Sequence, residues 1–235
     1  MAFSAQNVLR QWYRPQSGKH TGGLGRPSTD RPLYENTAKR TLDIVGSLLL
    51  LLLFGPLMVL LWLVVGLDGG PGIYRQRRLG AEGVPFDCLK FRSMRVDSDA
   101  ALQRHLAENP AAAEEWRLNH KLKNDPRITP IGRFLRRSSL DELPQLLNVL
   151  RGEMSLVGPR PIVAAEVPRY ARYYASYKSC RPGITGLWQV SGRCTTRYSR
   201  RVALDHRYCR NWAFLLDVRI ILVTPIVMIF GSGAY

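Results

Sequence analysis

The sequence is short of acidic residues, and this shortage bounds the kind of partner to expect. Among 235 residues, 34 are lysine or arginine and 18 are aspartate or glutamate, so the net charge is +16 and the pI is about 10.3. Such an excess implies an acidic partner: nucleic acid, anionic lipid or a phosphorylated substrate. Charge alone favours nucleic acid, so the hydropathy pattern has to decide among the three.

Cysteine and histidine are scarce, and neither shows the spacing of a metal site. The four histidines are scattered, and the four cysteines form no CxxC pair: Cys88, Cys180, Cys194 and Cys209. No zinc site is therefore expected, and the cysteines are typical of reduced cytosolic thiols rather than of a disulfide framework.

The first part of the chain lacks apolar periodicity. Residues 1–36 are rich in glycine, proline, serine and arginine. They contain no hydrophobic core of a cleaved signal peptide, so we expect a flexible basic tail there.

One long hydrophobic run stands out. Leu48–Leu67 is uncharged for about twenty residues, the length that spans a bilayer. Gly55-Pro56 falls at its middle, where proline removes a backbone hydrogen bond and kinks a helix. This run argues against a soluble nucleic-acid binder and favours a partner at a membrane.

The charges around this run bear on its topology. Basic residues flank both ends, with Lys39 and Arg40 before it and Arg75, Arg77 and Arg78 after it. The positive-inside rule then favours both ends on the cytoplasmic side, as in a re-entrant helix that dips into the bilayer and returns. The length equally fits a helix that crosses the bilayer, so composition leaves both topologies open.

The middle of the chain predicts a small β element followed by helices. Ile73–Arg78 and Pro85–Met94 have the pattern of short strands or a hairpin, and Lys90 and Arg92 would share one strand face. The charged, alanine-rich segment from Asp97 to about Lys123 predicts two helices that are broken at Asn109-Pro110.

The last third of the chain predicts further helices. Val163–Tyr177 has the pattern of an amphipathic helix with a basic, tyrosine-rich face, which suits the headgroup zone of a membrane or, alternatively, a soluble salt-bridged helix. Arg181–Arg193 is a glycine-spaced loop whose backbone could approach a ligand. In Trp212–Phe230 the uninterrupted apolar part, Ile220–Phe230, is too short to span, so this helix either lies at the interface or packs on the domain.

These patterns together predict an α+β, mostly helical chain with a membrane helix near its beginning. We expect three parts: a tail at 1–36, the membrane helix at 37–72, and a catalytic or binding domain at 73–235.

The strongest candidate for a functional site is an adjacent pair of carboxylates, Asp141 and Glu142. Two neighbouring carboxylates repel each other, and here they lie among arginines: Arg133, Arg136, Arg137, Arg151 and Arg160. This combination is understandable if a polyanion, or a metal ion carrying one, is held there.

A structural interpretation of the same residues is a helix start. Ser139 and Glu142 could form a capping box, but Pro144 would then clash inside the first turn. A helix that starts at Pro144, with Leu140–Leu143 as the turn before it, avoids this clash. Capping and a functional site both remain open from these residues alone.

Six separated motifs in order resemble the bacterial sugar transferase family, the monotopic polyprenyl-phosphate phosphoglycosyl transferases. They are KFRSM at 90–94, DPR at 125–127, SLDELPQ at 139–145, NVLRGEMS at 148–155, VGPRP at 157–161 and RPGITGLWQVSGR at 181–193. The resemblance covers about residues 37–235 and is most similar to members that initiate exopolysaccharide synthesis as undecaprenyl-phosphate galactose phosphotransferases. Many members carry Ser-Pro at the helix break, whereas this chain has Gly55-Pro56.

The resemblance implies an activity and a place in the cell. A UDP-sugar would donate galactose-1-phosphate or glucose-1-phosphate to undecaprenyl phosphate, with release of UMP, as the first membrane step of exopolysaccharide synthesis. The enzyme would be monotopic in the bacterial inner membrane, with a kinked re-entrant helix broken at Gly55 and Pro56, amphipathic interfacial helices, and its catalytic domain on the cytoplasmic face. Membrane lipid and downstream glycosyltransferases are the further partners implied, and nucleic acid is not one.

The resemblance also implies roles for individual residues. Asp141 would be the nucleophile of a covalent aspartyl intermediate and a ligand of Mg²⁺, and Glu142 would assist it. The residues expected to contact phosphate or substrate are Lys90, Arg92, Arg136, Arg160, Gln189, Arg193 and Asp205. From composition alone, a non-catalytic basic adaptor that binds anionic lipid at the membrane surface remains the alternative.

Overall fold

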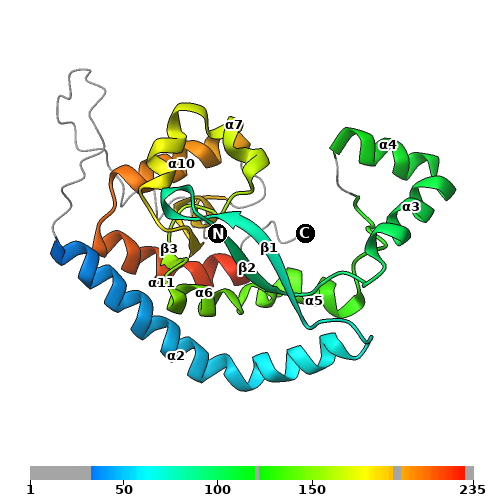
Figure 1. The fold of residues 1–235 in the computed structure, drawn as a ribbon, viewed down its shortest axis with the longest axis horizontal. Coiled ribbons are helices and arrows are strands. Elements are labelled where there is room, and N and C mark those ends of the chain that lie inside the picture. Colours follow the sequence, from blue (N-terminus) through cyan, green and yellow to red (C-terminus); the bar gives the residue numbers. More distant parts are fainter. Residues whose placement is uncertain (1–32, 120–121, 193–196, 231–235) are drawn as a thin grey trace. The chain divides into compact units, whose positions relative to one another are not determined.

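The computed structural model describes residues 33–119, 122–192 and 197–230, which are mostly helical, with two small two-stranded sheets (Figure 1). The helices are α2 (Leu33–Gly66), α3 (Ser98–Glu108), α4 (Pro110–Asn119), α5 (Pro130–Ser138), α6 (Gln145–Arg151), α7 (Val167–Tyr170), α8 (Tyr174–Lys178), α9 (Leu187–Val190), α10 (Tyr198–Arg210) and α11 (Phe214–Phe230). The strands are β1 (Ile73–Leu79), β2 (Pro85–Phe91), β3 (Ser155–Val157) and β4 (Gly183–Thr185), and short 3-10 turns are η1 (Ala81–Gly83), η2 (Leu140–Glu142), η3 (Ala164–Glu166) and η4 (Ala171–Tyr173). The predicted fold class is confirmed to this extent.

The chain folds into two compact units, and each is built from separate segments of sequence. The first unit contains the residues up to Gly55, Arg75–Leu89 and the residues from Gln145 onward. The second unit contains Pro56–Tyr74 and Lys90–Pro144.

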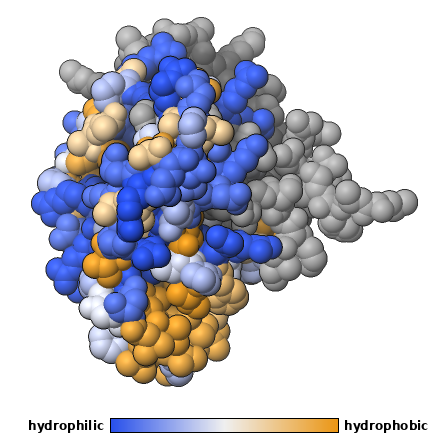
Figure 2. Space-filling view, turned by 90° about the vertical axis from the view of Figure 1, so that its right-hand side faces the viewer, coloured by the Kyte–Doolittle hydropathy of each residue, from blue (hydrophilic) through white to orange (hydrophobic). Residues whose placement is uncertain are grey.

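Helix α2 passes from the first unit into the second and is strongly apolar. Its residues Thr37–Gly66 are long and apolar enough to cross a membrane. Many large side chains between Val45 and Leu67 are exposed, and the apolar surface of its last turns forms the orange atoms at the bottom of Figure 2. Pro56 lies inside α2 without ending it, so the predicted kink at Gly55-Pro56 stays a prediction.

The first unit is centred on a parallel pair of strands that α11 covers. β3 pairs with β4, with Ser155 opposite Gly183, and backbone comes so close to Gly183 that no Cβ would fit there. One face of α11 is buried at Asp217, Ile220 and Val227, and the helix contacts both strands. Of the two predicted alternatives for this segment, packing on the domain is therefore confirmed.

The core of the second unit is formed by the last turns of α2 and by α5. Leu61 and Val65 of α2 are buried against Phe91 and Leu135. Around them pack partly buried apolar residues: Leu57, Met58, Ile73, Ile131, Leu140 and Leu143. Helix α2 is therefore apolar on two faces. One face packs in the core of the second unit, and the other face is exposed.

Two local predictions are confirmed. The predicted strands are β1 and β2, joined by the short turn η1. The predicted helix pair is α3 and α4, separated by Asn109, and the two helices pack against each other.

Two predictions for the last third are wrong. Residues 163–177 do not form one helix but the short pieces η3, α7, η4 and α8, because Pro168 lacks an N–H group and Ala171 has a φ of 44°. The tyrosines of this segment serve the core rather than a membrane face, since Tyr170 and Tyr177 are buried. The predicted loop at 181–193 contains β4 and α9 in its described part.

Of the predicted tail, Leu33–Asn36 form the first turn of α2 and residues 1–32 lie outside the described part.

Candidate active site

The carboxylate pair lies in a tight turn between two helices. Ser139 ends α5 in the left-handed conformation, with a φ of 57°, and its side chain caps no helix. The 3-10 turn η2 follows, and α6 begins at Gln145. The capping-box interpretation is therefore wrong, and the interpretation that the Leu140–Leu143 turn precedes a helix near Pro144 is confirmed.

Two leucines hold this turn in place. Leu140 and Leu143 pack against the apolar core of the second unit, on either side of Asp141 and Glu142. Hydrophobic anchoring on both sides fixes the backbone of the pair without using the carboxylate oxygens. The turn therefore presents two carboxylates from a rigid support.

The pair has cationic neighbours from the same unit. Lys90 Nζ, at the end of β2, lies 2.7 Å from Oε1 of Glu142. Arg136 belongs to the last turn of α5, and its Nε donates to Oγ of Ser93 at 2.8 Å. Burial and the charge of Glu142 raise the pKa of Asp141 to about 6, while Lys90 and Arg136 act in the opposite direction. Asp141 is thus a carboxylate whose negative charge is poorly compensated by the protein alone.

This donor set fits Mg²⁺ better than a metal that needs an all-protein cage. No cluster of three or more histidine, cysteine, aspartate or glutamate residues occurs in the described part of the chain. Mg²⁺ is commonly held by one or two carboxylates together with substrate phosphates and water. Asp141 and Glu142 supply two such oxygen ligands, and the raised pKa of Asp141 is what a nearby cation would lower.

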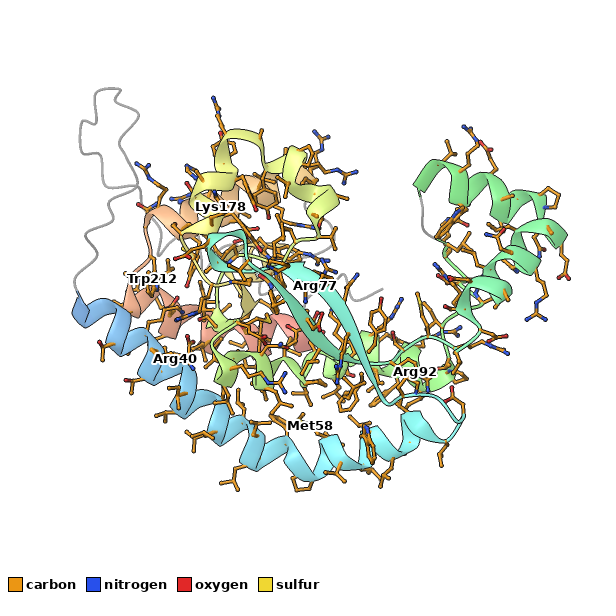
Figure 3. The ribbon with its side chains drawn as sticks, viewed as in Figure 1. Arg40, Met58, Arg77, Arg92, Lys178 and Trp212 are labelled. Atoms are coloured by element: carbon orange, nitrogen blue, oxygen red, sulfur yellow. The ribbon has the colours of Figure 1, made fainter. Side chains whose placement is uncertain are left out.

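Arg92, a predicted phosphate ligand that is labelled in Figure 3, is buried and donates to acceptors of the protein. Its Nε donates to the carbonyl of Pro71 at 2.8 Å and its Nη2 donates to the carbonyl of Val65 at 2.8 Å. Both Nη groups also reach the carboxylate of Asp68, at 2.7 Å for Nη1, and hold the pKa of Asp68 at about 2. These contacts support a role in fixing the end of α2 rather than in binding phosphate.

The other predicted ligands belong to the first unit. Arg160 and Asp205 lie close together there, since the backbone of Arg160 hydrogen-bonds Asp205. Gln189 belongs to α9, but its Nε2 donates to the carbonyl of Ile184 at 3.2 Å. Arg193 lies outside the described residues.

Asp205 is deeply buried on α10. The Tyr170 hydroxyl donates to its Oδ2 at 2.7 Å, while its Oδ1 is buried and has no hydrogen-bond partner in the described part of the chain. Burial raises the pKa of Asp205 to about 7, although Tyr170, Arg160 and Arg201 favour its charged form. This geometry supports a positioning role for Asp205 beneath Arg160.

Sequence reasoning missed two groups of residues. Trp188 and Arg201 lie beside Arg160, with the guanidinium carbon of Arg201 4.5 Å from the Trp188 ring centre. Arginine near tryptophan is common, so no sequence signal singles them out. The second group is a buried network around Asp217, described next.

Asp217 of α11 joins α2 to the rest of the first unit. Its carboxylate accepts from Lys39 Nζ at 2.8 Å, from the Tyr208 hydroxyl at 2.6 Å and from Trp212 Nε1 at 2.9 Å. Arg40, the next residue of α2, donates to the carbonyl of Val149 at 2.7 Å (Figure 3). The sequence does contain a signal for this network. Asp217 is a charged residue inside an apolar helix, and a buried charge is rarely left without a partner.

The chain is similar in sequence to a known protein family and to several of its members. The family model described as bacterial sugar transferase matches residues 34–231. The chain is 52% identical over 197 residues to the undecaprenyl-phosphate galactose phosphotransferase of Salmonella typhimurium, which is 84% of this chain and 41% of that protein. It is 47% identical over 199 residues to the exopolysaccharide production protein ExoY of Rhizobium meliloti, with 84% and 88% covered.

A third relative is named for a different sugar. The UDP-glucose:undecaprenyl-phosphate glucose-1-phosphate transferase of Caulobacter vibrioides is 40% identical over 210 residues, with 84% of this chain and 72% of that protein covered. The chain spans about two fifths of the length of the first curated relatives it matches, and most of the length of ExoY.

Proposed function

Because the chain belongs to the bacterial sugar transferase family, we propose that it transfers a sugar-1-phosphate from a UDP-sugar to undecaprenyl phosphate and releases UMP. The names of its relatives support both substrates, since they specify undecaprenyl phosphate and a galactose or glucose donor. Galactose is the first candidate, because the relative named for it is the more similar of the two.

The observation that carries this proposal is the rigid turn that bears Asp141 and Glu142. A carboxylate is a weak nucleophile toward a diphosphate unless nearby cations offset the negative charge of both groups. Lys90 and Arg136 supply such charge within the same unit, and both act on the pKa of Asp141. The site therefore combines a half-buried carboxylate with groups that attract phosphate.

The reaction can proceed in two displacements at phosphorus. In the first, an Asp141 oxygen bonds to the β-phosphorus of the UDP-sugar, and the bond to the bridging oxygen breaks, so that UMP leaves with the electron pair. In the second, a phosphate oxygen of undecaprenyl phosphate bonds to the same phosphorus and the Asp141 carboxylate is released. The product is undecaprenyl diphosphate sugar, and the two substrates need not be bound together.

Asp141 and Glu142 are the residues that would hold Mg²⁺. When bound, this ion would offset the charge of the diphosphate as a Lewis acid. Lys90 pairs with Glu142 at 2.7 Å and would orient that carboxylate. Arg136, whose Nε donates to Ser93, would meet a phosphate oxygen with its other donors.

For α2 we propose a re-entrant course in the bacterial inner membrane, with both units on the cytoplasmic face. The chain passes between the two units within α2 and again at residues 74/75, 89/90 and 144/145. A helix that crossed the bilayer would require further crossings at those three junctions. In the described part of the chain, α2 is the one helix long and apolar enough to make a crossing. A single dip by α2 removes this difficulty, and downstream glycosyltransferases would then meet the product on the cytoplasmic side.

Radiolabelled substrate tests the activity. The purified protein in detergent with Mg²⁺ and undecaprenyl phosphate should release UMP from UDP-galactose, with UDP-glucose tested beside it. Omission of undecaprenyl phosphate should reduce turnover to the amount of enzyme present, because the aspartyl intermediate would accumulate. Binding of anionic vesicles without turnover of any common UDP-sugar would instead favour a membrane-surface adaptor.

Cysteine labelling tests the topology. Asn36 lies in the first turn of α2 and Tyr74 lies in β1, after the end of α2, so Asn36→Cys and Tyr74→Cys report on the two sides of the helix. Both should resist a membrane-impermeant thiol reagent added to intact cells. Both should react after the cells are lysed. Labelling of one end alone in intact cells would show that α2 crosses the bilayer.

A further inference from the structure

Two arginines of the first unit lie against the same aromatic ring. The guanidinium carbon of Arg160 lies 5.6 Å from the Trp188 ring centre, and that of Arg201 lies 4.5 Å from it. Arg201 also lies over Tyr198, at 5.2 Å. Contact with a ring positions the plane of a guanidinium group but uses none of its N–H donors.

One donor of each arginine, and the donor of the tryptophan, lack an acceptor among the described residues. Nε of Arg160, Nε of Arg201 and Nε1 of Trp188 are buried and make no hydrogen bond there. Trp188 is buried, with 5% of the residue exposed. Unpaired buried donors are costly, so a native cluster of them calls for an explanation such as an absent ligand.

A third arginine adds to the same positive field. Burial lowers the pKa of Arg78, and the charge of nearby Arg160 lowers it further. Arg78 Nη1 donates to the carbonyl of Pro161 at 2.9 Å, while its Nε is buried without a partner. The surrounding acids are Glu166, 3.7 Å from Arg78, and Asp205 beneath Arg160 and Arg201. Three guanidinium groups thus face two carboxylates, one of which is held by Tyr170.

We propose that Arg160 and Arg201, supported by Trp188, form a binding site for the phosphate group of a substrate. Phosphate is the ligand of choice because guanidinium edges meet two of its oxygens at once, and its charge offsets the excess of arginines. The phosphate could come from UMP, from the lipid carrier, or from free orthophosphate. The binding site itself does not depend on catalysis by Asp141, which belongs to the other unit, whereas the identity of the ligand rests on the proposed function.

The test measures phosphate binding without turnover. Asp141→Asn protein serves as the background, and equilibrium binding is measured for orthophosphate, UMP and undecaprenyl phosphate in detergent. Uridine and undecaprenol are the matched ligands that lack phosphate. Arg160→Gln and Arg201→Gln are compared with Arg200→Gln, which removes the same charge from an exposed position of the same helix as Arg201.

Loss of either clustered arginine should weaken at least one phosphate ligand about 10- to 100-fold, the range of a charge-assisted hydrogen bond. Arg200→Gln should leave that affinity within about twofold, and no variant should change the affinity for uridine or undecaprenol. An effect on UMP assigns the site to the nucleotide, an effect on undecaprenyl phosphate assigns it to the carrier, and an effect on orthophosphate alone overturns the assignment to a substrate.

A second pair of variants covers the case of impaired folding. Arg201→Lys keeps the charge and replaces the planar donors by a single ammonium group, so it should still weaken phosphate binding several-fold at an unchanged unfolding temperature. Trp188→Leu removes the support of both guanidinium planes and should weaken the same ligand as Arg201→Gln. Phosphate affinities equal to those of Arg200→Gln in all of these folded variants would overturn the proposal.

Discussion

Replacing Arg92 should test whether this arginine is a structural clasp or a phosphate ligand. In the structure its guanidinium group donates to the carbonyls of Val65, Pro71 and Met94, the last at 3.0 Å, and pairs with Asp68. Arg92→Ala would leave all of these acceptors without their donor. We therefore expect a loss of stability rather than a specific loss of substrate affinity.

The size of the effect follows from the exposure of the two partners. The Arg92 side chain is 8% exposed and the Asp68 side chain is 43% exposed. An exposed carboxylate contributes at most about 1 kcal/mol to such a pair. The three carbonyl acceptors together should raise the cost of Arg92→Ala to about 3 kcal/mol, after water solvates part of them. At about 2–4 °C per kcal/mol for a chain of this size, Arg92→Ala should lower the unfolding temperature by about 6–12 °C. Asp68→Asn should lower it by about 2–4 °C or less.

The assay combines thermal unfolding in detergent with the kinetics of UMP release. Arg92→Ala should unfold early, and at temperatures where it remains folded its KM for the UDP-sugar should stay within about twofold of the wild-type value. Asp68→Asn is the matched control, because it removes the ion pair and keeps the three carbonyl bonds. An Arg92→Ala protein with the wild-type unfolding temperature and a greatly raised KM would refute the structural role and restore the sequence prediction.

Three further predictions concern single carboxylates. Asp141→Asn should abolish UMP release and should show no sugar-phosphate adduct by mass spectrometry; an adduct on this variant would place the nucleophile elsewhere. Burial raises the pKa of Asp205 to about 7, so the folded protein binds this proton more tightly than the unfolded chain, and the associated stability is lost as the pH rises from about 4 to 7. At pH 8 Asp205→Asn should therefore be more stable than the wild type by a few kcal/mol, at roughly 1.4 kcal/mol per pKa unit, and should unfold at a higher temperature; an equal or lower unfolding temperature would contradict this. Asp217→Asn should destabilise more than Lys39→Met, because it removes the negative charge that pairs with buried Lys39 and replaces one of two acceptor oxygens by a donor among three buried donors, whereas Lys39→Met leaves Asp217 with Tyr208 and Trp212; the reverse order of unfolding temperatures would contradict this.

Local patterns were sufficient for the parts of the fold that depend on short-range chemistry. Asn109-Pro110 separates α3 from α4 because proline is tolerated at a helix start and not inside it. The turns around β1 and β2 were likewise visible as glycines between apolar residues. The carboxylate pair could be recognised because arginines precede it at 133, 136 and 137 and follow it at 151 and 160.

Long-range contacts account for what the sequence did not reveal. Tyr170 and Tyr177 have the spacing of an amphipathic surface, but their hydroxyls bond to Asp205 and to the carbonyl of Leu79, which are distant in sequence. A tyrosine hydroxyl can bond either to a membrane headgroup or to a buried acceptor of the protein. The local sequence does not show which, because the buried acceptor is distant in sequence. The same holds for Lys39, whose buried partner Asp217 is 178 residues away.

The arginines show most clearly why a site cannot be assigned by residue type. Arg92 and Arg160 both occur in family motifs and look equally suited to bind phosphate. In the structure, Arg92 is met by three backbone carbonyls, whereas Arg160 is placed by the Trp188 ring and its Nε lacks an acceptor within the described part. A guanidinium group whose donors are met by the protein can hold the fold together but has little left for a ligand. One that is oriented by a ring keeps its donors for an anion, and on this ground Arg160 and Arg201, rather than Arg92, are the arginines to examine for substrate binding.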